Sequence, residues 1–228
     1  AAPRDIPTGF ALGDLSPDFG KVQVVSARPR TRFAPEEITL AARLGFLEES
    51  VTVTGWRIET RRGETIRIPQ ATSLYRTSAI GAEEDIVLTG GARLAIYATS
   101  SPLGDFRVNK CMGYLEELFH ISPPLAVGCP RVDAPATVTL SGACQEHIES
   151  LRGCDAPDLN APGVRGDGAC QEYLRTLTYS GCVERERNSR DFFRPEWRVY
   201  VDKQVLDSLH DRVLLFDERG LLVDEYHY

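Results

Sequence analysis

The sequence lacks the features that would place it in a membrane or on a nucleic acid. No stretch of the 228 residues approaches the roughly 20 consecutive apolar residues that a transmembrane helix requires. The formal net charge is -7 and like charges do not form long runs, so neither a transmembrane segment nor a nucleic-acid partner is expected. The one local basic patch that the spacing suggests consists of Arg28, Arg30 and Arg32.

Assembled catalytic and metal-binding motifs are also missing. The sequence contains no P-loop, no Gly-x-Gly-x-x-Gly fingerprint and no Gly-x-Ser-x-Gly nucleophile elbow. Its histidines have no paired spacing, and the acidic loop at residues 155–160 lacks the glycine of an EF-hand. Adjacent carboxylates such as Glu116 and Glu117 indicate solvated surface rather than an acid–base pair. We therefore predict no catalytic residue, no metal site, no cofactor and no enzymatic activity.

Cysteine, in contrast, is present in an informative number. Six cysteines fall within residues 111–182 and none forms a Cys-x-x-Cys pair. An even number without zinc or redox spacing predicts disulfides, and therefore an oxidising compartment outside the cytosol. The chain begins with Ala1 rather than Met, from which we expect that a targeting segment has been removed. The predicted localisation is extracytoplasmic, either secreted or in the cell envelope.

Residues 20–104 and 196–228 have the pattern of a β domain. Apolar and polar residues alternate, as in half-buried strands, at residues 21–26, 37–41, 51–59 and 65–68. Hairpins are predicted between residues 85–89 and 92–98, around Gly90-Gly91, and between residues 212–216 and 221–226. Short strands without interleaved helices predict an antiparallel sandwich or barrel.

Two tryptophans fall in this β pattern, and two other segments interrupt it. Trp56 and Trp197 are predicted to be core residues rather than ligand platforms. Residues 1–19 contain proline and glycine without periodicity, which predicts an N-terminal arm or linker. Residues 105–195 are rich in cysteine, proline and glycine, so the sequence predicts a Cys-rich insert within the β domain.

A short internal repeat organises the insert. Ala-Cys-Gln-Glu occurs at residues 143–146 and again at 169–172, and aliphatic residues follow each copy at helical spacing. Each first cysteine and the next two aliphatics share one helical face, so we predict two short helices. Antiparallel helices would give the bridges Cys111–Cys129, Cys144–Cys182 and Cys154–Cys170. Parallel helices would instead give Cys144–Cys170 and Cys154–Cys182. We predict the antiparallel set.

Several β segments carry a further likeness. Residues 53–58 (Val-Thr-Gly-Trp-Arg-Ile) contain a Thr-Gly-Trp triplet, and residues 66–69 (Ile-Arg-Ile-Pro) form a strand that ends in proline. With residues 88–97 and a closing hairpin at 211–228, these segments resemble the lamin tail domain family. Residues 37–40 (Glu-Ile-Thr-Leu) depart from the family's glutamate–aliphatic–Asn pattern in the second strand.

The insert resembles that of secreted bacterial lamin-tail proteins, through Asn-Lys-Cys-x-Gly-Tyr at residues 109–114, Gly-Cys-Pro at 128–130 and Trp-Arg-Val-Tyr at 197–200. The resemblance to the lamin tail family covers about half of the chain, residues 20–104 and 196–228. It implies an immunoglobulin-like β-sandwich and an envelope or surface location. It implies no known activity.

The sequence thus predicts an all-β, immunoglobulin-like sandwich with a disulfide-stapled, partly α-helical insertion. The function it favours is a non-catalytic secreted or cell-surface module that binds protein or glycan, as in adhesion. The alternatives are a structural subunit of a cell-surface assembly, which adds strands or packs with copies of itself, and an enzyme of unrecognised type. The candidate binding residues are aromatic and arginine side chains of the insert: Tyr114, Phe119, Tyr173, Tyr179, Arg185, Phe192 and Phe193.

Overall fold

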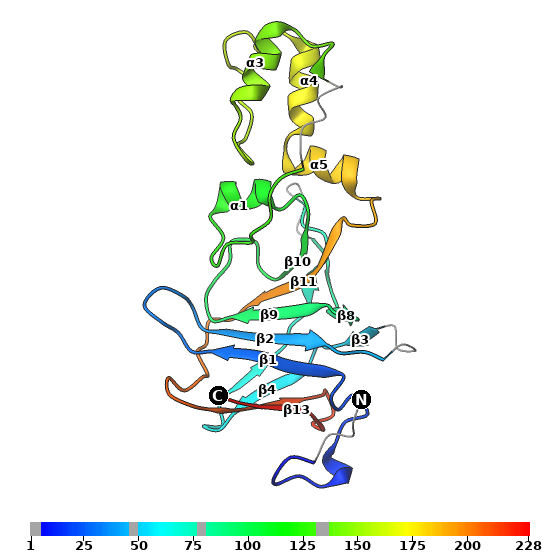
Figure 1. Cartoon of the computed structure of the whole chain (residues 1–228), viewed down its shortest axis with the longest axis vertical. Helices are drawn as coiled ribbons and strands as arrows, with labels where there is room; N and C mark the ends of the chain where they lie inside the picture. The colour runs from blue at the N-terminus through cyan, green and yellow to red at the C-terminus, as the bar shows by residue number, and fades with distance from the viewer. Residues whose placement is uncertain (1–5, 46–49, 77–80, 131–136) are drawn as a thin grey trace. The chain divides into compact units, whose positions relative to one another are not determined.

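The computed structural model describes residues 6–45, 50–76, 81–130 and 137–228. Strands in sheets make up 29% of the residues and helices 18%, so the regular structure is mostly β. It divides into two compact units, which are described separately (Figure 1). The β unit comprises residues 1–75, 79–107 and 195–228, and the Cys-rich unit comprises residues 76–78 and 108–194.

The strands form three sheets. Their bounds are β1 (Val22–Arg28), β2 (Glu37–Ala42), β3 (Ser50–Thr52), β4 (Arg57–Thr60), β5 (Thr65–Arg67), β6 (Ala71–Thr72), β7 (Glu83–Glu84), β8 (Val87–Thr89), β9 (Arg93–Tyr97), β10 (Phe106–Asn109), β11 (Phe193–Tyr200), β12 (Arg212–Phe216) and β13 (Leu222–His227). The largest sheet has the order β1-β2-β9-β11-β10-β6-β7, the second β13-β12-β4-β5, and the smallest β3-β8.

One hydrophobic core joins these sheets. Alternating side chains such as Ile38 on β2, Leu94 on β9 and Leu215 on β12 belong to a single cluster of buried residues. Trp56 and Trp197 lie in the same cluster and are each 3% exposed. Burying each large aliphatic side chain contributes roughly 1.5–3 kcal/mol, so the period-two pattern read from the sequence accounts for the main stabilisation of the β unit.

Two expectations about strand pairing are wrong. Segments 85–89 and 92–98 do not form a hairpin, because β8 pairs with β3 whereas β9 pairs with β2 and β11. The pairing is also not wholly antiparallel, since β11 runs parallel to β9 and β10 parallel to β6. Parallel neighbours require a long connection, and the chain between β9 and β11 supplies one. The predicted hairpin of β12 and β13 is confirmed.

The expected strand at residues 51–59 is divided. β3 ends at Thr52 and β4 begins at Arg57, with a turn between them at Thr54 and Gly55. Gly55 has φ +81°, a left-handed conformation that glycine adopts without steric cost. The apolar positions shift phase at this turn, from Val51 and Val53 before it to Trp56 and Ile58 after it.

Residues 6–19 pack on the β unit instead of forming a free arm. The Phe10 ring lies 6.2 Å from that of Phe216, and the Arg212 guanidinium lies 5.7 Å from the Phe10 centroid. The Ser16 hydroxyl donates to the Asp217 carboxylate at 2.8 Å. A short 3-10 helix, η1 (Leu12–Asp14), lies between these two contacts in the sequence. The part of the predicted arm at residues 1–5 is outside the described residues.

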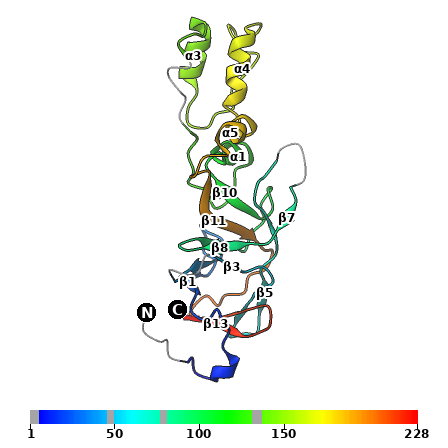
Figure 2. The same cartoon turned by 90° about the vertical axis from the view of Figure 1, so that its right-hand side faces the viewer.

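In the Cys-rich unit the predicted repeat helices are present. The helices are α1 (Gly113–Phe119), α3 (Gly142–Ser150), α4 (Gly168–Thr176) and α5 (Tyr179–Glu186). Each repeat helix begins at a capped residue: Ser141 Oγ accepts from the Cys144 N–H at 3.3 Å, and Asp167 Oδ1 accepts from the Cys170 N–H at 3.0 Å. Figure 1 and Figure 2 both show α3 and α4 side by side.

The disulfides differ from the predicted set. The bridges are Cys111–Cys182, Cys129–Cys154 and Cys144–Cys170, so none of the three predicted pairs occurs. The Ser141 hydroxyl donates to the Asp167 carboxylate at 2.7 Å, which places the starts of α3 and α4 together. The cysteines three residues after these caps therefore meet, as in the parallel alternative. Its second bridge does not form, because Cys182 lies inside α5 rather than after α4.

These bridges compensate for a small core. Cys144 and Cys170, both fully buried, are central to a cluster with Ile148, Leu174 and other side chains. Disulfides form and persist mainly in oxidising environments, so three bridges indicate an extracytoplasmic one.

Candidate functional site

Two of the seven predicted binding residues are interior residues. Tyr179 is 5% exposed and Phe192 is 1% exposed. The Tyr179 hydroxyl accepts from Asn109 Nδ2 at 3.3 Å, and the Phe192 ring packs edge-on against Phe193 at 4.8 Å. Their prediction as contact residues is wrong, because a unit with so few aliphatic side chains uses its aromatic residues as core.

Three of the others come together from different helices. Burial raises the pKa of the Tyr114 phenol on α1, while nearby Arg185 on α5 lowers it and Tyr173 on α4 raises it. Arg185 Nε lies 3.0 Å from the Glu186 carboxylate, and its Nη1 donates to the Thr176 carbonyl at 3.1 Å. Because Glu186 already pairs with the Arg185 charge, the cluster is better suited to joining helices than to holding an anionic ligand. Phe119 and Phe193 are half-buried.

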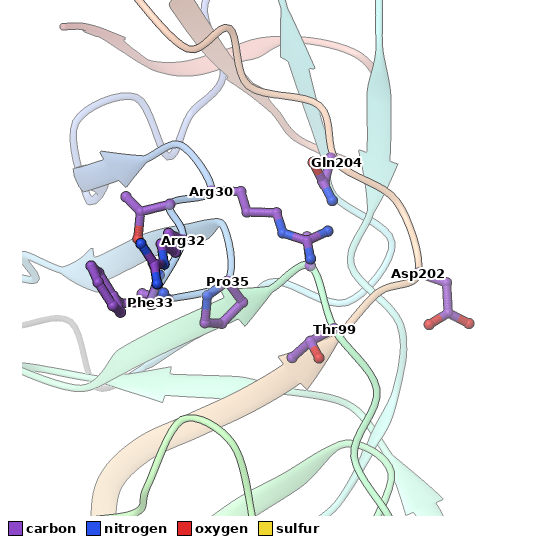
Figure 3. A pocket seen from close by; sticks show the side chains of 10 residues that line it. Arg30, Arg32, Phe33, Pro35, Thr99, Asp202 and Gln204 are labelled. Atoms are coloured by element: carbon purple, nitrogen blue, oxygen red, sulfur yellow. The ribbon is translucent and has the colours of Figure 1, made fainter.

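A different site lies in the β unit, among loops that are distant in sequence. A cavity of about 430 Å³, which we call the loop-end pocket, is bounded by the β1–β2 loop, the residues after β9 and the residues after β11 (Figure 3). This volume is in the range of small-molecule sites. The pocket is lined by Arg30, Thr31, Arg32, Phe33, Ala34, Pro35, Ala98, Thr99, Asp202 and Gln204.

The tip of the β1–β2 loop is fixed by its own hydrogen bonds. Thr31 Oγ1 accepts from the N–H groups of Phe33 and Ala34 at 3.2 and 3.1 Å, and the Thr31 N–H donates to the Ala34 carbonyl at 3.0 Å. This turn holds the Phe33 ring in solvent, where it is 89% exposed. A single exposed aromatic side chain is common on protein surfaces, so Phe33 bears on binding only together with the other residues that line the pocket.

Glu36 joins the walls of the loop-end pocket. Its side chain is buried, and its two carboxylate oxygens accept from the N–H groups of Val205 and Leu206 at 2.8 and 3.2 Å. Its carbonyl accepts from the Ala98 N–H at 3.0 Å. Burial raises the pKa of Glu36, and the two hydrogen bonds to its carboxylate oppose that rise. Through its side chain and its backbone carbonyl, the one residue Glu36 thus links the end of the β1–β2 loop to the segments that follow β9 and β11.

The charges of the loop-end pocket are not neutralised within the described residues. Arg28, just outside the pocket, lies 3.5 Å from the Glu37 carboxylate, whereas Arg30, Arg32 and Asp202 have no ion pair in the described part of the chain. The Arg32 guanidinium lies 5.3 Å from the Phe33 centroid. Figure 3 shows Arg30 extending toward Thr99 and Gln204, with Phe33 on the other side of the loop.

A second group of titratable residues lies on one face of the large sheet. Burial raises the pKa of Tyr97 to about 12 and that of Asp105 to about 6. The Arg198 guanidinium lies 5.4 Å from the Tyr97 centroid, and its Nε is 2.7 Å from the Glu196 carboxylate. The Arg198 charge is thus paired with Glu196 and stacked on Tyr97, whereas Asp105 accepts a hydrogen bond from the Tyr200 N–H at 2.7 Å.

Comparisons with known protein families, curated proteins and solved structures found no match for this chain. Among the described residues no helix is long and apolar enough to span a bilayer, and no group of three or more His, Cys, Asp or Glu is placed to hold a metal ion. The site is therefore assigned from geometry. The sequence indicated the Arg28, Arg30 and Arg32 patch, but it gave no sign of Phe33, Asp202 or Gln204.

Proposed function

We propose that this protein is a non-catalytic, exported binding module of the cell envelope or surface that recognises carboxylate groups through the loop-end pocket. The observation that carries the proposal is the pair Arg30 and Arg32, which line the pocket and have no ion-pair partner in the described chain. The scaffold we propose is an immunoglobulin-like β-sandwich of the lamin tail type, and the disulfides support export.

Physical chemistry favours a carboxylate ligand. An arginine guanidinium binds a carboxylate through two parallel charge-assisted hydrogen bonds, which are stronger than neutral ones. Aromatic and arginine side chains dominate the energetics of many interfaces. The hydrogen bonds of Thr31 fix the loop before binding, so little additional conformational entropy is lost when the ligand docks.

The alternative of assembly by strand addition has less support. At the β1 edge the Asp224 carboxylate accepts from the Val24 N–H at 2.8 Å, next to a bulge between Val24 and Ser26. The edge strands β5 and β7 are three and two residues long, and β7 consists of two glutamates. Short, charged or bulged edges disfavour pairing with another chain.

The proposal is tested with polymers that differ in charge. Oxidised protein is immobilised, and binding of polyglutamate, polygalacturonate and neutral dextran is measured by biolayer interferometry. We expect at least one acidic polymer to bind and dextran not to bind, with binding weakened by added salt. The double variant Arg30→Ala/Arg32→Ala is expected to lose roughly tenfold or more in affinity.

Arg28→Ala is the control, because it removes one positive charge from the last residue of β1, next to the same loop, but takes a guanidinium already paired with Glu37. It is expected to retain most of the affinity. Absence of binding to both acidic polymers, or an equal loss in Arg28→Ala and the double variant, would refute the proposed function.

A further inference from the structure

We infer that the ligand of the loop-end pocket is a uronic acid unit of a glycan, whose carboxylate binds Arg30 and whose hydroxyls bind Asp202 and Gln204. This inference rests on the proposed function and adds the class of ligand. It is drawn from the second wall of the pocket, formed by the residues after β9 and β11 rather than by the β1–β2 loop.

The pocket has opposite charges on its two sides. Arg30 belongs to the β1–β2 loop, while Asp202 follows β11, and the two side chains make no ion pair with each other. An ionised carboxylate only accepts hydrogen bonds, so Asp202 can accept from a ligand donor and repels a second carboxylate. The arrangement suits a ligand with one carboxylate next to hydroxyl groups, and disfavours a segment with several adjacent acids.

The uncharged lining also matches a sugar. The Gln204 amide and the Thr99 hydroxyl each donate and accept, as the hydroxyls of a pyranose require. In Figure 3 Arg30 reaches between these two side chains. The Pro35 ring lines the same pocket and offers an apolar surface for the C–H face of a sugar ring. With Phe33 and Arg32 beside it, the site combines a charge anchor, hydroxyl partners and apolar contact.

Isothermal titration calorimetry with three small probes tests this inference. The probes are trigalacturonate, its methyl ester, which keeps the sugar but not the charge, and triglutamate, which keeps the charge but not the sugar. We expect trigalacturonate to bind roughly tenfold or more tightly than either of the others, since each lacks one set of partners.

The variant Asp202→Ala separates the two ligand classes by the sign of its effect. It removes a hydroxyl acceptor, so trigalacturonate affinity should fall roughly fivefold to tenfold. It also removes a repulsive charge, so triglutamate affinity should stay the same or increase. Arg28→Ala should change neither, and unchanged tryptophan fluorescence of each variant reports that the β unit is folded.

These measurements separate the uronate assignment from the proposed carboxylate-binding function on which it rests. Triglutamate binding as tightly as trigalacturonate, or trigalacturonate affinity unchanged in Asp202→Ala, would overturn the uronate assignment and leave a carboxylate-binding module. Failure of both acidic probes and both acidic polymers to bind would overturn the proposed function itself.

Discussion

Replacing Asp105 with Asn is expected to stabilise the β unit at neutral pH but not in acid. Asp105 Oδ1 accepts from the Tyr200 N–H at 2.7 Å, and the Asn amide oxygen can accept the same bond. Burial raises the pKa of Asp105 from 3.8 to about 6, the Tyr200 hydrogen bond opposes this rise, and nearby Glu83 adds to it. The substitution therefore removes a charge that the folded state disfavours.

The size of the effect follows from the two pKa values. The difference between 3.8 and about 6 corresponds to roughly 3 kcal/mol at about 1.4 kcal/mol per pKa unit. Asp105 is partly exposed, and solvent screening reduces this figure, so we expect about 1–2 kcal/mol. Because the pKa is raised on folding, the stability that Asp105 contributes is fully present below pH 3.8 and is lost as the pH rises through about 6.

The assay is urea unfolding followed by tryptophan fluorescence between pH 3.5 and 8. The chain has two tryptophans, Trp56 and Trp197, and both are in the β unit, so the signal reports this unit. The stability gain of Asp105→Asn over wild type should increase from its value at pH 3.5 to a plateau above pH 7. A difference between variant and wild type that does not change with pH would refute this reasoning.

Asp217→Asn is the control of opposite sign. Burial raises the pKa of Asp217, but hydrogen bonds from Leu221, Ser16 and Arg219 outweigh it, so the net pKa is lowered. Its stabilising contribution is therefore present at neutral pH and is lost as the pH falls through the lowered folded pKa. The destabilisation by Asp217→Asn should accordingly be largest at neutral pH and shrink in acid.

Two further substitutions test contacts that stabilise the two units, one in the Cys-rich unit and one in the β unit. Gly113→Ala would place its Cβ 2.6 Å from Cys154 Sγ and 2.7 Å from the Val127 carbonyl oxygen, so we expect the free energy of unfolding to fall by about 1–3 kcal/mol. Thermal melts followed by the circular dichroism of the helices measure this change. Gly142→Ala, where nothing lies within 4 Å, should be neutral or stabilising, and equal losses would contradict the packing argument. Glu36→Ala leaves the buried Val205 N–H and the partly buried Leu206 N–H without their acceptors. It should lower the free energy of unfolding in urea by about 1–3 kcal/mol and also weaken the binding of acidic polymers. Glu218→Ala, at an exposed residue, should change neither quantity.

Patterns within a few residues were sufficient to predict many elements. Alternation located β1, β2, β5 and the β12–β13 hairpin, because a half-buried strand shows its two faces directly in the sequence. Helical spacing located α3 and α4, and their caps Ser141 and Asp167 stand at the positions where such residues start helices.

Whether the aromatic residues of the insert are buried or exposed could not be predicted in the same way. Aromatic side chains are typical of binding surfaces, yet Tyr179 and Phe192 are buried. Burial depends on how much other apolar material a unit contains and on where its bridges hold the chain. Neither is a property of the residue or of its neighbours in sequence.

By itself the sequence determined the β-rich class, the two repeat helices and the presence of disulfides, because each depends on local periodicity or on residue number. Only the tertiary structure decided which segments meet. It made β9 and β11 parallel, joined Cys144 to Cys170 through adjacent helix starts, and placed Asp202 and Gln204 opposite Arg30. It also separated Arg28, which Glu37 neutralises, from Arg30 and Arg32. Such differences arise from contacts between residues distant in the chain, and no local pattern encodes them.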